Sequence, residues 1–207
     1  MNPYIFRFKS ISVSWFIVLT LISIFLGLIT VKTLKDKVNL SKSKLEDIYF
    51  ILIFTGFIGA RLSYVLLNFE AYNQNLSDIF KLTHFNLNLA GGVFFALAGL
   101  FIISKMQKIS LYSLLEIYII PFYLSMSIGV WSMFFNGMIV GREYEGFLSL
   151  KYLGKQRHMV VMYLSIMFIL GIILQLTVLK KIKIKYKTPL LLLLILVCYY
   201  FIKIFFT

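Results

Sequence analysis

The chain has 207 residues, of which 60% are hydrophobic and only 14% are charged. A soluble domain carries about 25% charged residues, so this composition excludes an ordinary soluble protein. The formal net charge is +13, but the basic residues lie between apolar runs and are not interleaved with aromatic residues in a basic stripe. That pattern argues against nucleic acid as a partner and is typical of the loops of a membrane protein.

The only cysteine, Cys198, lies in a leucine-rich run, which excludes a disulfide or a cysteine-based metal site within one chain. We therefore expect no metal and no cofactor. Near the N-terminus, the apolar run Phe16–Thr30 lacks the small-residue cleavage site of a signal peptide and continues as a full span.

A membrane-spanning helix needs about 20 mostly apolar residues. Six stretches meet this requirement, and we predict spans over residues 11–31, 48–68, 87–104, 111–135, 160–179 and 189–206. They predict an all-α membrane protein, built as one transmembrane domain over residues 1–207 with a bundle of about six helices. The polar stretch 136–159 is predicted to be a small loop at the membrane surface.

The basic residues in the loops predict how the bundle is oriented. Twelve lie on one side, namely Lys32, Lys35, Lys37, Lys42, Lys44, Lys105, Lys108, Lys180, Lys181, Lys183, Lys185 and Lys187. Seven lie on the other, namely Arg7, Lys9, Lys81, Arg142, Lys151, Lys155 and Arg157. Lys and Arg are in excess in cytoplasmic loops, so both termini and the loop 136–159 are predicted to lie outside.

With this orientation, Arg61 lies about 10 Å below the outer surface, at 1.5 Å per helical residue. Ionisable residues inside a membrane are costly, and most face a bundle interior or a wet cavity. Together with Lys203, Arg142 and Arg157, Arg61 predicts a cationic cavity in the outer half. Its expected ligand is an anionic phospholipid head group, because guanidinium binds phosphate through two parallel hydrogen bonds.

Each of these residues also has a plainer interpretation. Lys203 can be a lysine that extends its ammonium to the interface, and Gly91-Gly92 can be a close-packing surface between helices. Arg142 and Arg157 can be ordinary bases beside the membrane. Glu116, the only acid in a predicted span, lies nearer the inner side, and the sequence does not define its role.

Four motifs carry a resemblance to a known family. They are Gly-Ala-Arg-Leu-Ser-Tyr-Val-Leu at 59–66, Asn-Leu-Ala-Gly-Gly at 88–92, the stretch 129–142 with its Asn-Gly and Gly-Arg pairs, and Arg-His-Met-Val-Val-Met-Tyr at 157–163. In this order, the chain resembles the prolipoprotein diacylglyceryl transferases of bacteria. These enzymes of the cytoplasmic (inner) membrane move the diacylglyceryl group of phosphatidylglycerol onto the lipobox cysteine of prelipoproteins.

The resemblance implies phosphatidylglycerol or another anionic phospholipid, and prelipoprotein signal peptides, as partners. Its phosphate-binding candidates are Arg61, Arg142 and Arg157. Its catalytic candidates are Arg157 and His158, with His158 as the base. The cavity would be lined by Tyr64, Gly91, Gly92, Asn136, Gly137, Gly141 and Tyr163.

The chain also departs from the family pattern at reactive positions. Ala90 stands where the family has the histidine thought to be catalytic, and Val130 where it has an arginine. Met133 and Met138 replace an asparagine and a glutamate of the same signature. Further family side chains are replaced by Phe16, Tyr200 and Ile204, and the loop between Gly141 and Arg157 is much shorter than the family's.

Two hypotheses follow. The chain is a divergent diacylglyceryl transferase, or a non-catalytic relative that binds anionic lipid, a lipoprotein or a membrane partner in the outer cavity. The family resemblance favours the transferase, whereas the substitutions at reactive positions favour the non-catalytic alternative. A transporter or channel has little support, because the spans lack an acid–base relay and no inverted repeat is visible.

Overall fold

The computed structural model describes residues 3–8, 11–34, 38, 40–73, 75–80, 86–182, 184 and 186–207. Six lysines that enter the orientation count lie outside these residues: Lys9, Lys35, Lys37, Lys81, Lys183 and Lys185. The chain forms two compact units, one from Met1–Thr30 with Glu116–Thr207 and the other from Val31–Leu115. Each unit is described by itself.

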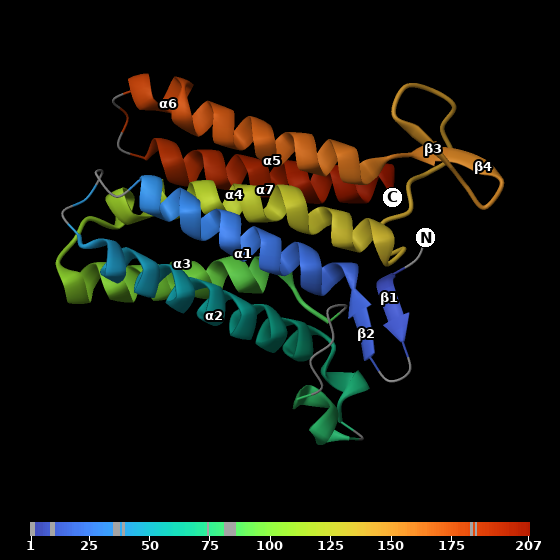
Figure 1. Ribbon diagram of the computed structural model, residues 1–207, viewed down its shortest axis with the longest axis horizontal. Coiled ribbons are helices and arrows are strands. Elements are labelled where there is room, and N and C mark those ends of the chain that lie inside the picture. Colours follow the sequence, from blue (N-terminus) through green and yellow to red (C-terminus); the bar gives the residue numbers. More distant parts are fainter. Residues whose placement is uncertain are drawn as a thin grey trace. The chain divides into compact units, whose positions relative to one another are not determined.

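Six apolar helices make up most of the chain (Figure 1). They are α1 (Trp15–Thr33), α2 (Lys42–Leu67), α3 (Leu89–Gln107), α4 (Leu111–Phe135), α5 (Val160–Leu176) and α7 (Lys187–Phe206). By length and composition five can cross a membrane, and α5, with 17 residues, is a shorter apolar helix. This confirms the predicted class, an all-α membrane protein with six apolar helices. The side on which the termini lie stays a prediction.

Several helix ends differ from the predicted spans. The first span begins later, at Trp15, because Ile11–Ser14 forms strand β2, which pairs with β1 (Tyr4–Phe8). The second begins earlier, at Lys42, where the Ser41 side chain caps the helix by accepting a hydrogen bond from the Lys44 amide. Hydropathy detects where apolar residues lie, so it misses charged turns that extend a helix beyond the membrane.

The fifth predicted span is also divided. Helix α5 ends at Leu176, and a separate turn, α6 (Val178–Lys181), follows before α7 begins at Lys187. Here the Lys187 ammonium lies 3.6 Å from the Glu116 carboxylate and donates hydrogen bonds to the carbonyls of Leu179 and Ile182. Glu116 therefore has a cationic partner that also holds the start of α7 to the end of α6.

In the unit Val31–Leu115, α2 and α3 lie side by side and pack through small residues (Figure 1). A Cβ added to Gly91 would lie 2.0 Å from the Ser63 Oγ, and one added to Gly92 would lie 3.1 Å from the Gly56 carbonyl oxygen. A Cβ on Gly59 would lie 2.2 Å from the Phe95 Cβ. These approaches support the close-packing interpretation of Gly91-Gly92, since they bring two backbones together.

Asn88 attaches the start of α3 to α2. Its side-chain oxygen accepts a hydrogen bond from the Gly91 amide at 2.9 Å, which caps the helix. Its own backbone N–H donates to the Ala60 carbonyl at 2.9 Å. The first turn of α3, which carries Ala90, is thus fixed beside Ala60 in the C-terminal third of α2.

We expect Gly91→Ala to lower the free energy of unfolding by about 1–3 kcal/mol, because the added methyl forces Ser63 or the backbone to shift. Gly129→Ala in α4 is the matched control, since a Cβ there would meet nothing within 4 Å. It should be neutral or stabilise by roughly 0.5 kcal/mol through helix propensity. Unfolding in mixed detergent micelles measures both variants, and equal losses in the two would contradict the close approach.

In the other unit, α4, α5 and α7 share a core (Figure 1). The ring of Phe168 in α5 lies between Tyr123 of α4 and Tyr199 of α7, with ring centroids 6.3 Å and 6.2 Å away. The Ser165 hydroxyl donates to the Ser127 carbonyl at 2.9 Å and ties α5 to α4. Val130 is only 1% exposed and belongs to this core.

Candidate functional site

The site begins where α4 ends. As the sequence predicts, Asn136-Gly137 stops the helix: α4 ends at Phe135, and Gly137 takes a φ of +69°. Glycine adopts this left-handed conformation at no steric cost because it has no Cβ. The chain then turns back, and the Arg142 amide donates to the Phe206 carbonyl at 2.9 Å. The end of α4 is thereby joined to the C-terminal end of α7.

A small β-hairpin follows, in which β3 (Ser149–Tyr152) pairs with β4 (Lys155–His158) (Figure 1). Glu143 pairs with Arg157 on the free side of β4. Two backbone hydrogen bonds flank this bridge, from the His158 amide to the Arg142 carbonyl and from the Tyr144 amide to Gln156. Strand β4 therefore lies between β3 and the segment 142–144.

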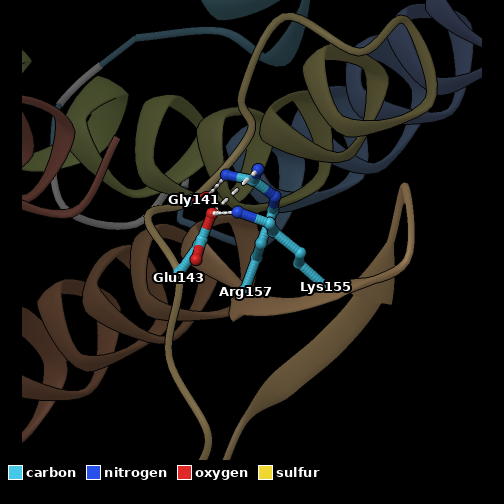
Figure 2. Close-up of polar contacts among 4 residues, drawn as sticks. All are labelled: Gly141, Glu143, Lys155 and Arg157. Atoms are coloured by element: carbon cyan, nitrogen blue, oxygen red, sulfur yellow. Dashed lines mark hydrogen bonds and ion pairs between the residues drawn. The ribbon is translucent and has the colours of Figure 1, made fainter.

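Arg157 is the centre of the polar contacts in this segment (Figure 2). Its Nη1 donates to the Gly141 carbonyl at 3.0 Å, and its Nη2 lies 3.8 Å from the Glu143 Oε1. The same Glu143 oxygen accepts a hydrogen bond from the Lys155 ammonium. The Arg157 Nε is buried, and none of the residues that the structure describes accepts a hydrogen bond from it. A buried N–H without an acceptor is costly and therefore calls for an explanation.

His158 is held by aromatic side chains. Its Nδ1 lies 2.9 Å from the Tyr163 hydroxyl oxygen, and its ring stacks on Tyr144 with centroids 3.9 Å apart. Phe206 contacts the ring edge-on at 5.0 Å. A cavity of about 10 Å³, at the lower limit of what can hold one water molecule, is lined in part by Gly141, Arg157 and His158.

The hydrogen bond from Lys155, together with the positive charges of Lys155 and Arg157, holds the pKa of the exposed Glu143 carboxyl below its ordinary value of 4.5. A lowered pKa means that the ion pair stabilises the folded state above pH 4.5 and that this contribution disappears as the pH falls through the lowered pKa. We expect hydrogen-exchange protection of the Tyr144 amide to drop from about pH 6 to about pH 3, after correction for intrinsic exchange. In Glu143→Gln this pH dependence should be absent, and a drop of equal size there would contradict the assignment.

Arg61 has a different environment, in the unit Val31–Leu115. It is 6% exposed and makes five hydrogen bonds, as many as a guanidinium has N–H groups. Its acceptors, at 3.0–3.4 Å, are the carbonyls of Asp78, Ile79 and Asn86 and the hydroxyl of Tyr72. Arg61 thus fastens the loop between α2 and α3, which includes the short turns η2 (Phe69–Ala71) and η3 (Leu76–Phe80). The predicted phosphate-binding role of Arg61 stays a prediction.

The structure brings together one group of the predicted site residues, namely Gly141, Arg142, Arg157, His158 and Tyr163. Asn136 and Gly137 lie at the start of the same loop, and the Asn136 Oδ1 is buried without a partner. Arg61, half-buried Tyr64, Gly91 and Gly92 belong to the other unit. That both groups line one cavity stays a prediction.

Sequence reasoning missed the acidic and aromatic members of the cluster, Glu143, Tyr144 and Phe206. The only available signal was the spacing of Lys155 and Arg157, which puts both side chains on one face of a strand. Among the positions predicted to depart from the family pattern, Val130 is buried in the core, whereas Ala90 and Met138 are exposed.

The fold and this cluster define a multi-pass α-helical membrane protein with cationic, imidazole and phenol groups gathered at one end of three helices. The chain matches the family model of prolipoprotein diacylglyceryl transferases over residues 3–207, and it therefore belongs to that family.

Among curated proteins, the chain is similar to phosphatidylglycerol–prolipoprotein diacylglyceryl transferases of bacteria. It is 29% identical to that of Clostridium kluyveri over 148 residues, which covers 70% of this chain and 58% of the relative. It is 30% identical to that of Fusobacterium nucleatum over 141 residues, covering 68% and 49%. The chain thus spans about half the length of the curated relatives that it matches. Its helices and relatives identify it as a bacterial multi-pass membrane protein.

Proposed function

We propose that this protein is a diacylglyceryl transferase of the bacterial cytoplasmic membrane. Its substrates would be phosphatidylglycerol and the lipobox cysteine of a prelipoprotein. One observation carries the proposal: Arg157, whose buried Nε–H has no acceptor among the described residues, lines the same small cavity as His158. A guanidinium that lacks an acceptor suits a phosphate, and a neighbouring imidazole suits a thiol proton.

The proposed reaction forms one bond and breaks one bond. The cysteine sulfur attacks the glyceryl carbon that carries the phosphate, and a sulfur–carbon bond forms. The carbon–oxygen bond to the phosphate breaks, and glycerol phosphate leaves with the electron pair. The thiol proton passes to His158, because the thiolate is the reactive nucleophile.

Each side chain has a role in that scheme. Arg157, assisted by Arg142, binds the phosphate and stabilises the charge that develops on the leaving oxygen. The Nδ1–H of His158 donates to the Tyr163 hydroxyl oxygen, in the tautomer that leaves Nε2 free to accept the proton. Stacking on Tyr144 fixes the imidazole plane.

A second candidate function is lipid binding without catalysis. It is favoured by Val130, which stands at a family arginine position and is packed into the core at 1% exposure. No cation can act from that position in this chain. The non-catalytic protein would use the same Arg157 site to hold an anionic head group.

Purified protein in nanodiscs that contain phosphatidylglycerol, supplied with a lipobox peptide, separates the two functions. The transferase releases glycerol phosphate only with the peptide, and His158→Gln lowers the rate about 10²–10³-fold, as expected for loss of a general base. Saturable binding of phosphatidylglycerol without any release would instead support the second candidate. If neither release nor saturable binding occurs, both fail.

A further inference from the structure

Glu143, Lys155 and Arg157 lie on one face of the small sheet (Figure 2). Glu143 is the bridge partner of Arg157, and residues directly opposite each other in neighbouring strands project to the same side. Lys155 precedes Arg157 by two positions in β4, so it projects to that side as well. One carboxylate is therefore shared by two cations.

The protein does not supply hydrogen-bond acceptors, among its described residues, for every N–H group of the Arg157 guanidinium. Its Nη1 donates a hydrogen bond to the Gly141 carbonyl, but the 3.8 Å between Nη2 and Glu143 is too long for one. Within the described part of the chain, Nε has no acceptor. Nε and Nη2 form the lateral fork that binds two oxygens of a phosphate or carboxylate in parallel. Arg61, by contrast, has all five N–H groups bonded to protein acceptors.

We propose that Glu143 is an internal competitor for the phosphate site on Arg157. Without lipid, its carboxylate is an anion 3.8 Å from Nη2, one of the two nitrogens of that fork, and Lys155 holds it there. A head-group phosphate has to displace it before both N–H groups can bind the phosphate oxygens. This inference rests on the proposed function and adds a residue that sets how tightly the anionic head group binds.

The displacement has a modest cost, because the side chains of Glu143 and Lys155 are 56% and 59% exposed. When Glu143 moves, its charge is rehydrated, and Lys155 becomes a second cation for the phosphate. With Glu143 in place, the trio of Glu143, Lys155 and Arg157 has a net charge of +1. Once Glu143 has moved away, two cations face the lipid. Glu143 thereby competes successfully with weakly binding anions, whereas a phosphate that contacts both cations displaces it.

The test is binding of phosphatidylglycerol to the full chain in nanodiscs, titrated against phosphatidylcholine. Glu143→Gln is expected to tighten the apparent Kd roughly two- to fivefold, the range for release of a half-exposed ion pair. Glu145→Gln is the matched control, because it removes the same charge two residues further along in an exposed position. It should change the Kd by less than about 1.5-fold, since exposed charges are screened. Equal tightening in both variants would overturn the proposal.

Arg157→Gln separates failure of this inference from failure of the proposed function. If Arg157→Gln weakens binding and Glu143→Gln does not tighten it, the competitor role alone is refuted. If Arg157→Gln leaves binding unchanged, the phosphate site itself fails, and the competitor role fails with it. Tightening in Glu143→Gln together with weakening in Arg157→Gln is the result expected.

Discussion

Arg61→Ala is expected to lower the free energy of unfolding by about 3–5 kcal/mol, because it removes a buried and fully hydrogen-bonded cation. The guanidinium makes five hydrogen bonds within a site that leaves it 6% exposed. Its removal leaves the carbonyls of Asp78, Ile79 and Asn86 without their donor, and water must enter to replace it. The loop between α2 and α3 loses these attachments to α2.

Unfolding in detergent micelles, without phosphatidylglycerol, measures this loss. Arg61→Lys keeps the charge but has three N–H groups instead of five, so it should fall between Ala and wild type. Arg142→Ala is the control, because its guanidinium makes one exposed hydrogen bond, to Ile204, and should cost less than about 1 kcal/mol. Wild-type stability in Arg61→Ala would show that the five contacts do not hold the loop.

Arg157→Gln is expected to slow glycerol phosphate release about 10²–10³-fold, as loss of a donor aimed at developing charge does in other enzymes. Unlike Arg61, Arg157 makes one hydrogen bond to the described residues, with Gly141. The free energy of unfolding of the Arg157→Gln variant should therefore change by about 1 kcal/mol at most. Lys151→Gln is the control, because it removes a cation from an exposed position of β3 outside the trio, and its expected loss is less than about tenfold. Rates measured under saturating phosphatidylglycerol distinguish the variants, and an equal loss in both would refute a special role for Arg157.

The helices could be predicted because membrane spans leave a strong signal in hydropathy, and five of them are long enough to cross a bilayer. The hairpins β1–β2 and β3–β4 could not, because strands of four or five residues are too short for a periodic pattern. The β3–β4 turn also carries Leu153 at a φ of +51°, where sequence rules favour asparagine before Gly154.

The difference between the two central arginines was invisible in the sequence. Depth in the membrane predicted Arg61 as the ligand-binding residue, because an arginine inside a span needs a partner. The structure supplies that partner from a loop 11–25 residues further along the chain, which no local pattern reveals. Arg157, by contrast, is left with an unpartnered N–H by a strand register that sequence reasoning does not give.

The contact between His158 and Tyr163 was easier to predict from the sequence. Both residues belong to one motif in the sequence, and five positions across a strand-to-helix junction bring them to 2.9 Å. Their neighbours Tyr144 and Phe206 join only through tertiary structure, because the former precedes the hairpin and the latter ends α7.

The most direct test of the account is the mass of a lipobox peptide after incubation with the purified protein in phosphatidylglycerol nanodiscs. The account predicts that one diacylglyceryl group is added to the peptide's cysteine. It predicts no addition when phosphatidylcholine replaces phosphatidylglycerol or when serine replaces the cysteine. An unmodified peptide in the presence of tightly bound phosphatidylglycerol would contradict the transferase and leave lipid binding as the function of the Arg157 site.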